Sequence, residues 1–333
     1  MSFPSGGAGP PRVSRNQDPQ SLLSGGAGPP RVSRNQDPRS VTDAGYVERE
    51  RQAAVRRHVL SRITIYVAAV LAALVAALPF LWGLITTFKQ DTDLYTLANN
   101  PFLFNDPPTL HHLTYLFTST GFATFARNTL LVGTAVVAIT LLIGVPAAYS
   151  LARLDLKWSG PLGIAIFFVY LVPPSLLFLS LSRVVVATGL QDSVWSLVLI
   201  YPTITIPVSV WLLIGFFKSV PRDIEEQAMV DGYSRLGAFM RTVLPLMFPG
   251  IVAVVVFAFT LAAHEFIYAL AFVADSSQKT VSVGVPTNLV RGDVFFWQSL
   301  QAATILVAVP IAFVFNLFLE RFIAGFTMGA VKG

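Results

Sequence analysis

The sequence predicts an all-α integral membrane protein with six transmembrane helices. Its 333 residues are 54% hydrophobic and only 12% charged, and the mean hydropathy of +0.64 is too high for an ordinary water-soluble domain. Apolar runs recur along the chain, and each holds the roughly 20 residues that a ~30 Å hydrocarbon core requires. The runs cover residues 63–88, 123–150, 160–184, 193–217, 251–274 and 299–323.

Residues 1–60 precede these runs and have a different composition. The segment SGGAGPPRVSRNQDP occurs at 5–19 and again, letter for letter, at 24–38. Gly, Pro, Ser and Arg dominate and leave little to bury, so we expect a disordered tail that leads into a basic juxtamembrane segment. Residues 61–333 then form one transmembrane domain.

The distribution of Lys and Arg predicts which loops face the cytoplasm, because cytoplasmic loops of membrane proteins carry an excess of both. The segments before the first run and after the second, fourth and sixth runs hold thirteen of them, against five on the opposite side. Both termini and the 218–250 loop are therefore predicted to be cytoplasmic. The net charge of +5 follows from the same bias and requires no nucleic-acid partner.

The 218–250 loop has the pattern of two short helices joined by a turn. We expect the first helix to begin near residue 220, with Ser219 as its N-cap and Pro221 in its first turn. Acidic residues follow at the positive end of this helix, and Asp231-Gly232 is a turn signal that ends it. The second helix has apolar residues at helical spacing and ends at two prolines: Leu236, Phe239, Met240, Val243 and Leu244, then Pro245 and Pro249.

Several kinds of chemistry are excluded by what the sequence lacks. No phosphate-binding G-x-x-x-x-G-K-[ST] motif occurs, so the chain is not expected to be an enzyme, and an ATP-driven motor has to be a separate subunit. No cysteine occurs, which removes disulfides and cysteine-based metal sites. His111 and His112 are adjacent in an outer loop without a carboxylate cluster, so no metal site is predicted.

Two ionisable residues, His264 and Glu265, lie inside the fifth apolar run, where charged side chains are typically functional. In a continuous helix these neighbours point about 100° apart, and Tyr268 shares the face of His264. Three interpretations stay open. The residues line a solute path. Alternatively, they make a structural contact with a helix of a partner subunit or an ion pair of Glu265 with Arg183, or they form a proton relay.

The 218–250 loop resembles the EAA loop of binding-protein-dependent ABC importers, whose pattern is roughly E-A-A-x-x-x-D-G followed by L-P and P-G. Here the matching elements are Glu226-Gln227-Ala228, with Gln for the first Ala, Asp231-Gly232, Leu244-Pro245 and Pro249-Gly250. The resemblance implies a cytoplasmic coupling helix that inserts into a groove of a separate ATPase. It assigns the contact and its turn to Glu225, Glu226, Ala228, Asp231, Gly232, Phe239, Leu244 and Pro245.

The resemblance extends over most of the chain after residue 60. It includes NTLLVG at Asn128, AAYSLARL at 147–154 and QKTVSVGV before the sixth run. The tail RFIAGFTMGAVKG at 321–333 is similar to that of the second permease of the maltose-type family. In that permease the tail runs between two ATPase subunits, which implies an ATPase contact at Gly329, Ala330, Val331 and Lys332.

One departure from the family concerns the fifth run. Sugar importers often have W-N-[ED]-F where this chain has Ala263-His264-Glu265-Phe266, so the family's role for the first two of these positions is not carried over. For a solute path, the candidate residues are His264, Glu265 and Tyr268.

Membership of this family implies a type I ABC importer permease fold in the cytoplasmic membrane of a bacterium or archaeon. Such a chain forms the pathway for a sugar, oligosaccharide or polyol by alternating access. Its implied partners are a second homologous permease, two copies of an ABC ATPase, an extracytoplasmic solute-binding protein and membrane lipid, but no nucleic acid. The chain binds no cofactor, and the ATPase binds ATP and Mg²⁺. The alternatives are an importer of a glycerophosphodiester or peptide, and an ion-coupled secondary transporter that uses Glu265 and His264.

Overall fold

The computed structural model describes residues 38–154 and 157–330, and the chain divides into two compact units, Met1–Val70 and Leu71–Gly333. Almost the whole duplicated segment lies outside the described residues. The first element is helix α1 (Pro38–Phe88), which begins before the predicted domain boundary at residue 60.

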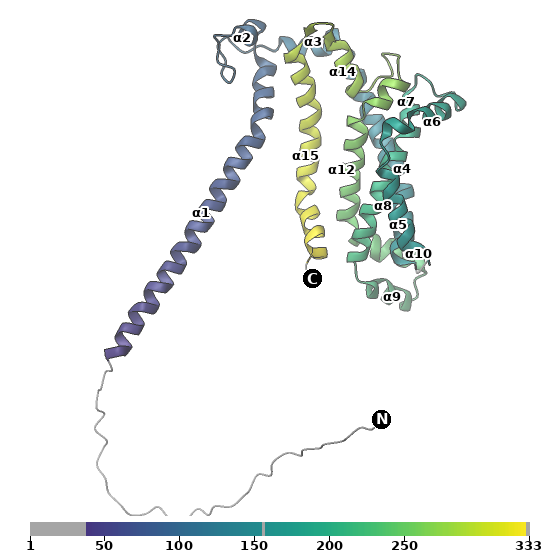
Figure 1. The fold of residues 1–333 in the computed structure, drawn as a ribbon. Helices are drawn as coiled ribbons and strands as arrows, with labels where there is room; N and C mark the ends of the chain where they lie inside the picture. Colours follow the sequence, from purple (N-terminus) through teal and green to yellow (C-terminus); the bar gives the residue numbers. More distant parts are fainter. Residues whose placement is uncertain (1–37, 155–156, 331–333) are drawn as a thin grey trace, which may run out of the picture. The chain divides into compact units, whose positions relative to one another are not determined.

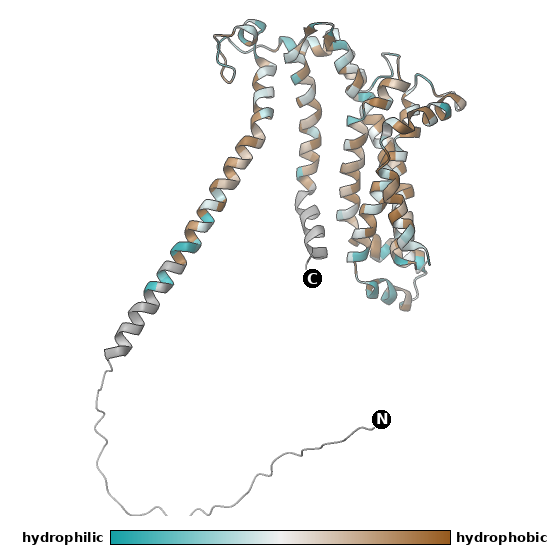
Figure 2. Ribbon diagram, viewed as in Figure 1, coloured by the Kyte–Doolittle hydropathy of each residue, from teal (hydrophilic) through white to brown (hydrophobic). Residues whose placement is uncertain are grey.

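Four described helices are long and apolar enough to cross a membrane, and two bent helix pairs raise the number to six if each pair is one span. The four are Val55–Phe88, Phe122–Arg153, Val194–Ser219 and Trp297–Leu317. They belong to α1, α4 (Phe122–Arg153), α7 and α8 (Val194–Ile200 and Pro202–Ser219), and α15 (Trp297–Ala330). Figure 2 shows apolar residues along much of α4, α8 and the coloured part of α15.

The third predicted run, 160–184, is bent. It forms α5 (Ser159–Tyr170) and α6 (Pro174–Ala187), whose axes meet at 92°. The bend lies at Pro173 and Pro174, because proline has no N–H for the helix ladder and keeps the preceding residue out of the helical region. Pro173 accordingly has an extended ψ of 131°.

The fifth predicted run, 251–274, is also interrupted. The helix α12 (Phe248–His264) ends at His264, and a short helix α13 (Ile267–Phe272) follows after a two-residue break. Before α12 the chain forms α9 (Arg222–Val230), α10 (Arg235–Ala238), a π-helical turn η1 (Phe239–Val243) and α11 (Leu244–Leu246). The expectation of one continuous helix over 251–274 is therefore wrong at Glu265 and Phe266.

Short elements cover the two ends of the second unit. One end carries α9 and α10, and the opposite end carries α3 (His111–Ser119) and α14 (Val281–Leu289) (Figure 1). The chain also forms α2 (Asp91–Tyr95) and a two-stranded hairpin of β1 (Val290–Arg291) and β2 (Val294–Phe295), paired with Val290 opposite Phe295.

The helix α4 lies at the centre of the packing and contacts α8, α12 and α14. Gly133 permits the close approach to α12, since a Cβ there would lie 2.5 Å from the Phe259 ring. The buried hydroxyls of Thr140 and Thr205 lie 2.7 Å apart and join α4 to α8 by a hydrogen bond. Interhelical hydrogen bonds of this kind stabilise helix pairs in membranes.

Candidate functional site

The predicted coupling loop begins where α8 ends. The prediction that Ser219 caps the next helix is wrong, because its hydroxyl donates a 2.8 Å hydrogen bond back to the carbonyl of Phe216 in α8. Pro221 occupies the N-cap position of α9 instead, with the extended values φ −58° and ψ 137°. Asp223 and Glu225 lie in the first turn, where the helix dipole favours negative charge.

The predicted turn at Asp231-Gly232 is confirmed. Gly232 has φ +94°, a left-handed conformation that side chains with a Cβ disfavour. Its N–H donates to the carbonyl of Met229, and the N–H of Tyr233 donates to the carbonyl of Ala228. These two bonds form a Schellman motif, which satisfies the last carbonyls of α9 and turns the chain into α10.

The second predicted helix forms, but with an irregular middle. Ser234 caps α10 by accepting a 3.2 Å hydrogen bond from the N–H of Gly237. A π-helical turn follows, in which the N–H of Leu244 donates to the carbonyl of Phe239. Pro245 explains the wider turn, because its ring would clash with the carbonyl four residues earlier in a regular α-helix.

Three residues assigned to the ATPase contact face the inside of the protein. Ala228 and Phe239 are 5% and 7% exposed, and the carboxylate residue Glu225 is 7% exposed. The hydroxyl of Tyr149 on α4 donates a hydrogen bond to Glu225 Oε1, and Arg153 Nε lies 4.0 Å from Glu225 Oε2. Glu225 therefore attaches α9 to α4 instead of extending outward.

The outward side of α9, α10 and the following turn η1 carries a different set of residues, which we call the coupling surface. Val230 is 87% exposed, Leu236 is 70% exposed and Met240 is 53% exposed. The exposed residues Glu226 and Asp231 lie on the same two-helix unit. Of the other assigned residues, Gly232 and Pro245 are exposed and Leu244 is half-buried.

Sequence reasoning missed Val230 as part of this exposed surface. The available signal was an apolar residue at the last position of a short helix, directly before the Asp231-Gly232 turn. An apolar side chain that extends into solvent beside charged neighbours is typical of a surface that binds another protein.

A second site lies at the break between α12 and α13. The Glu265 carboxylate accepts a 2.9 Å hydrogen bond from the Tyr201 hydroxyl and further bonds of 3.0 to 3.1 Å from the N–H groups of Tyr268 and Ala269. Ser282 Oγ donates a 2.7 Å bond to the carbonyl of Glu265. This carboxylate therefore replaces the backbone bonds that the interrupted helix lacks at the start of α13.

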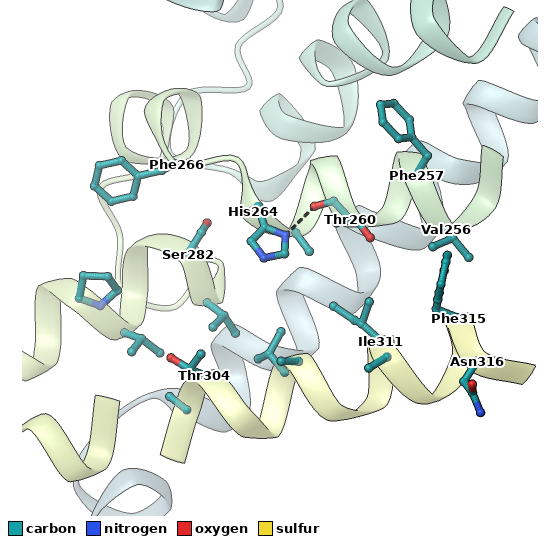
Figure 3. A pocket seen from close by; sticks show the side chains of 18 of the residues that line it. Val256, Phe257, Thr260, His264, Phe266, Ser282, Thr304, Ile311, Phe315 and Asn316 are labelled. Atoms are coloured by element: carbon teal, nitrogen blue, oxygen red, sulfur yellow. Dashed lines mark hydrogen bonds between the residues drawn. The ribbon is translucent and has the colours of Figure 1, made fainter. Parts of the chain in front are cut away.

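The break separates the three residues predicted for a solute path. Of the three, only His264 lines the open cavity between α12, α14 and α15, which has a volume of about 1110 Å³. Figure 3 shows His264 among its lining residues. Tyr268 is fully buried in the packing of the protein and does not line this cavity. Among the described residues, Glu265 makes no ion pair with Arg183. Its carboxylate instead accepts hydrogen bonds from the Tyr201 hydroxyl and from two backbone N–H groups.

The cavity is mainly apolar, with a few polar groups from three helices. Figure 3 shows Thr260 and His264 on α12, Ser282 on α14 and Thr304 on α15 among its lining residues. His264 Nδ1 lies 2.9 Å from the carbonyl of Thr260. Neither a Lys, an Arg, an Asp nor a Glu is among the described residues that line it.

The predicted contact at the C-terminal tail is only partly within the described residues. Gly329 and Ala330 end α15, whereas Val331 and Lys332 lie outside the described residues.

Membrane-length helices packed around a cavity, with a separate two-helix unit at one end, define the class of multi-span permeases. Within this class the chain belongs to the family described as binding-protein-dependent transport system inner membrane component, whose profile matches residues 141–327. It is therefore a multi-pass inner-membrane permease subunit of an ABC importer. The ATPase of such an importer is a separate subunit.

Individual relatives agree with this membership. The sulfoquinovosyl glycerol transport system permease protein SmoH of Agrobacterium fabrum is 35% identical over 77% of this chain and 88% of its own length. The trehalose/maltose transport system permease protein MalG of Thermococcus litoralis is 29% identical over 84% of this chain and its own full length. A solved bacterial ABC transporter that imports alginate superposes with a TM-score of 0.66 at 18% identity, covering 78% of this chain and 97% of its own, which shows the same fold.

Proposed function

We propose that this chain forms, with a second homologous permease, the pathway by which an ABC importer carries a carbohydrate into the cell. The complete importer contains two copies of the ATPase and an extracytoplasmic solute-binding protein. The observation that carries the coupling role is the coupling surface, which presents exposed apolar side chains on a rigid two-helix unit at one end of the bundle.

The orientation of the chain supports this role. The excess of Lys and Arg at the termini and in the 218–250 loop favours a cytoplasmic position for α9, where ATP is available. ATP and Mg²⁺ are bound by the partner. When two ATPase subunits close on ATP, they draw the coupling helices of both permeases together and open the cavity outward, and hydrolysis reverses the change.

The coupling surface suits an ATPase groove in shape and chemistry. Val230 and Leu236 supply apolar anchors, while Glu226 and Asp231 supply negative charge that favours a basic rim. The Schellman turn at Gly232 holds α9 and α10 together, which lowers the conformational entropy that the backbone loses on binding. Gly329, Ala330, Val331 and Lys332 are proposed to add a second contact with the ATPase.

The cavity at the helix break is proposed as part of the solute path. Non-helical backbone at membrane depth is tolerated where it is buried in protein or lines a cavity. The break at Glu265 is held by contacts within the protein, and its neighbour His264 lines the cavity. A carbonyl only accepts, so His264 Nδ1 is the donor to Thr260, and Nε2 is the ring nitrogen that remains for a solute.

Two hydroxyl groups of the cavity also donate their protons within the protein and can accept from a solute. Thr304 donates to the carbonyl of Leu300. Ser282 donates to the carbonyl of Glu265 and accepts from Thr280 Oγ1 at 3.0 Å, which leaves it one lone pair. Together with His264 they form hydrogen bonds with a hydroxylated solute. The apolar remainder, including Phe257, Phe266 and Phe315, suits the apolar face of a sugar ring.

The nature of the cargo rests on this lining and on the relatives. Relatives named for trehalose and maltose, diacetylchitobiose and arabinooligosaccharides are 27% to 29% identical to this chain. A carbohydrate is therefore favoured over a glycerophosphodiester, whose negative charge would find no cationic group in the described lining.

The experiment that tests this function purifies the chain with its partners and measures uptake of a radiolabelled disaccharide, delivered by the solute-binding protein, into proteoliposomes. Uptake should require ATP and should stop when the phosphate-binding lysine of the ATPase is substituted, with the complex still assembled. Uptake that continues under an ion gradient would instead identify a secondary transporter.

A further inference from the structure

Helix α4 is bound at both of its ends to segments that are distant in sequence. Its Asn128 and Tyr149 lie 21 residues apart, which corresponds to roughly 32 Å along a helix axis and so to about one bilayer thickness. One end is attached to α9 and the other to the segment that leads into α14. We propose that α4 is the rod that transmits the movement of α9 to the opposite end of the pathway.

The attachment at the α9 end involves two residues one helical turn apart. Tyr149 donates its hydroxyl hydrogen bond to Glu225, and Arg153 Nη2 donates a 2.6 Å bond to the carbonyl of Val220, between α8 and α9. The Tyr149 ring also packs on Phe239, with centroids 4.4 Å apart, and on Phe217, with centroids 5.8 Å apart. Tyr149 thus contacts α8, α9 and the π turn together.

The attachment at the opposite end is made by buried polar side chains. Asn128 is 3% exposed, and its Nδ2 donates bonds of 2.9 and 3.0 Å to the carbonyls of Ser277 and Lys279. Thr129 Oγ1 accepts a 2.8 Å bond from the N–H of Val281, where α14 begins. The next residue, Ser282, holds the carbonyl of Glu265 at the helix break, so this attachment reaches the cavity.

Between these attachments α4 is supported along its length. Pro146 lies inside the helix and would allow it to bend, but Val145 and Ala148 beside it are buried against Leu213 and Phe217 of α8. The Thr140 to Thr205 hydrogen bond adds a polar contact with the same helix. A movement of α9 is therefore carried by α4 and α8 as one packed body. Chains of packed side chains and hydrogen bonds of this kind can carry coupling between distant sites.

This inference rests on the proposed function, because it needs an ATPase that moves α9. It also changes the role of Glu225 from a contact of the ATPase to a positioning residue within the permease. The hydrogen bond from the Tyr149 hydroxyl to Glu225 is the connection on which the transmission depends most directly, since it joins a side chain of α4 to a side chain of α9.

The absence of native cysteine permits a direct test in the assembled complex. A cysteine at the exposed residue Ser276 reports on the far attachment through its labelling rate with a membrane-impermeant maleimide. The rate is measured without nucleotide and with ATP and vanadate, and the ratio of the two rates is compared between variants. ATPase binding and thermal stability are measured in parallel. A residue with a purely structural role should lower ATPase binding or thermal stability when it is substituted, whereas a residue that transmits movement should change the ratio of labelling rates and leave both unchanged.

We expect a ratio different from one in the parent complex and a ratio near one in Tyr149→Phe and in Asn128→Ala, with the ATPase still bound. Glu225→Ala should behave like Tyr149→Phe, whereas Glu225→Gln keeps an acceptor for the hydroxyl and should retain the parent ratio. Asp223→Ala, at an exposed acidic residue in the same turn, is the matched control and should also retain it.

The proposal is overturned if Tyr149→Phe or Asn128→Ala keeps the parent ratio. If either variant fails to assemble, the contrast between Glu225→Ala and Glu225→Gln decides, and equal ratios in these two variants overturn the proposal. If the parent complex hydrolyses ATP but its ratio of labelling rates is one, the result would contradict the proposed coupling. It would then also contradict the role of α4 as a rod.

Discussion

The Tyr201 hydroxyl lies 2.9 Å from Glu265 Oε2 and joins the junction of α7 and α8 to the break between α12 and α13. Tyr201 is 1% exposed, so neither group has water as an alternative partner on this side. The same carboxylate accepts the N–H groups of Tyr268 and Ala269. One side chain therefore stabilises an interruption of the fifth span that no proline or glycine imposes.

Substitution of Glu265 should show how much the break depends on this carboxylate. We expect Glu265→Ala to lower stability by about 2 kcal/mol or more, because hydrogen bonds to a charged group are worth roughly 1.5–3 kcal/mol and three buried donors lose their acceptor. Glu265→Gln, which keeps one acceptor oxygen, should lose less. Thermal unfolding of the purified chain in detergent measures both. Tyr170→Phe on α5 is the control. If Tyr170→Phe lowers the stability as much as Glu265→Ala does, the result would argue against a specific role of Glu265 at the break.

Gly232 should tolerate alanine better than proline. A Cβ at this position meets no atom within 4 Å, so Gly232→Ala carries only the strain of φ +94°, about 1 kcal/mol. Gly232→Pro cannot adopt this φ and also removes the N–H that donates to Met229, so ATP-driven uptake should be abolished while membrane insertion is kept. Uptake and insertion are measured in the same vesicles. Gly215→Ala in α8, where φ is negative and a Cβ also meets nothing, should leave uptake unchanged.

A charge on the coupling surface should weaken binding of the ATPase without affecting the fold. Leu236 is 70% exposed, so Leu236→Asp removes no internal packing but places a carboxylate where we propose an apolar contact. Truncation of an interface anchor typically lowers affinity by about 2 kcal/mol or more, which is roughly thirtyfold. Quantitative co-purification of the ATPase measures the loss. An equivalent charge at Leu142, which is 76% exposed on α4 away from this surface, should leave ATPase binding intact in any chain that inserts.

Acid should destabilise the loop after α1 through Asp93. Burial opposes ionisation of this carboxyl group, but hydrogen bonds from Asn105, Lys89 and the N–H of Asp106 outweigh it and lower the pKa of Asp93 from 3.8 to about 2. The pKa of Asp93 is lower in the folded chain than in the unfolded chain. Its contribution to stability is therefore fully present above pH 3.8 and is lost as the pH falls toward 2. Thermal unfolding at decreasing pH should show this loss.

The matched variants separate Asp93 from a general effect of acid. Asp93→Asn should be less stable than the parent at neutral pH and should lose less on acidification. Asp106→Asn, at a half-buried carboxylate that accepts one hydrogen bond from Thr92, should keep the sensitivity of the parent. Equal acid sensitivity of Asp93→Asn and the parent would show that another group is responsible.

The sequence predicted the spans, the loop and its turn, because these features depend on local composition. Length and hydropathy locate membrane helices, and a glycine after an acidic helix locates a Schellman turn, as at Gly232. The bend at Pro173 and Pro174 also had a local signal. The break at Glu265 had none, because its stabilising partners, Tyr201 and Ser282, are 64 and 17 residues away in sequence.

The direction of side chains in the coupling loop was harder to predict for the same reason. Glu225 and Glu226 are adjacent and chemically identical, yet only Glu225 is buried, because Tyr149 and Arg153 of α4 lie on its side of the helix. Ser219 satisfied the sequence rule for a helix cap, but α8 extends through it and takes up its hydroxyl. The periodicity of apolar residues in the sequence locates a helix and its polar side. Which side chains of that helix become buried depends on contacts with residues that are distant in sequence.

The most direct measurement of the central claim is the maleimide reactivity of a single cysteine at Leu236 in inverted membrane vesicles. We predict rapid labelling from the cytoplasmic side when the ATPase has been stripped from the vesicles, and protection on the order of tenfold when it is bound again, as expected for a residue at the centre of an interface. Equal labelling with and without the ATPase, or labelling from the outside of intact cells, would contradict the claim that α9 and α10 couple this permease to its motor.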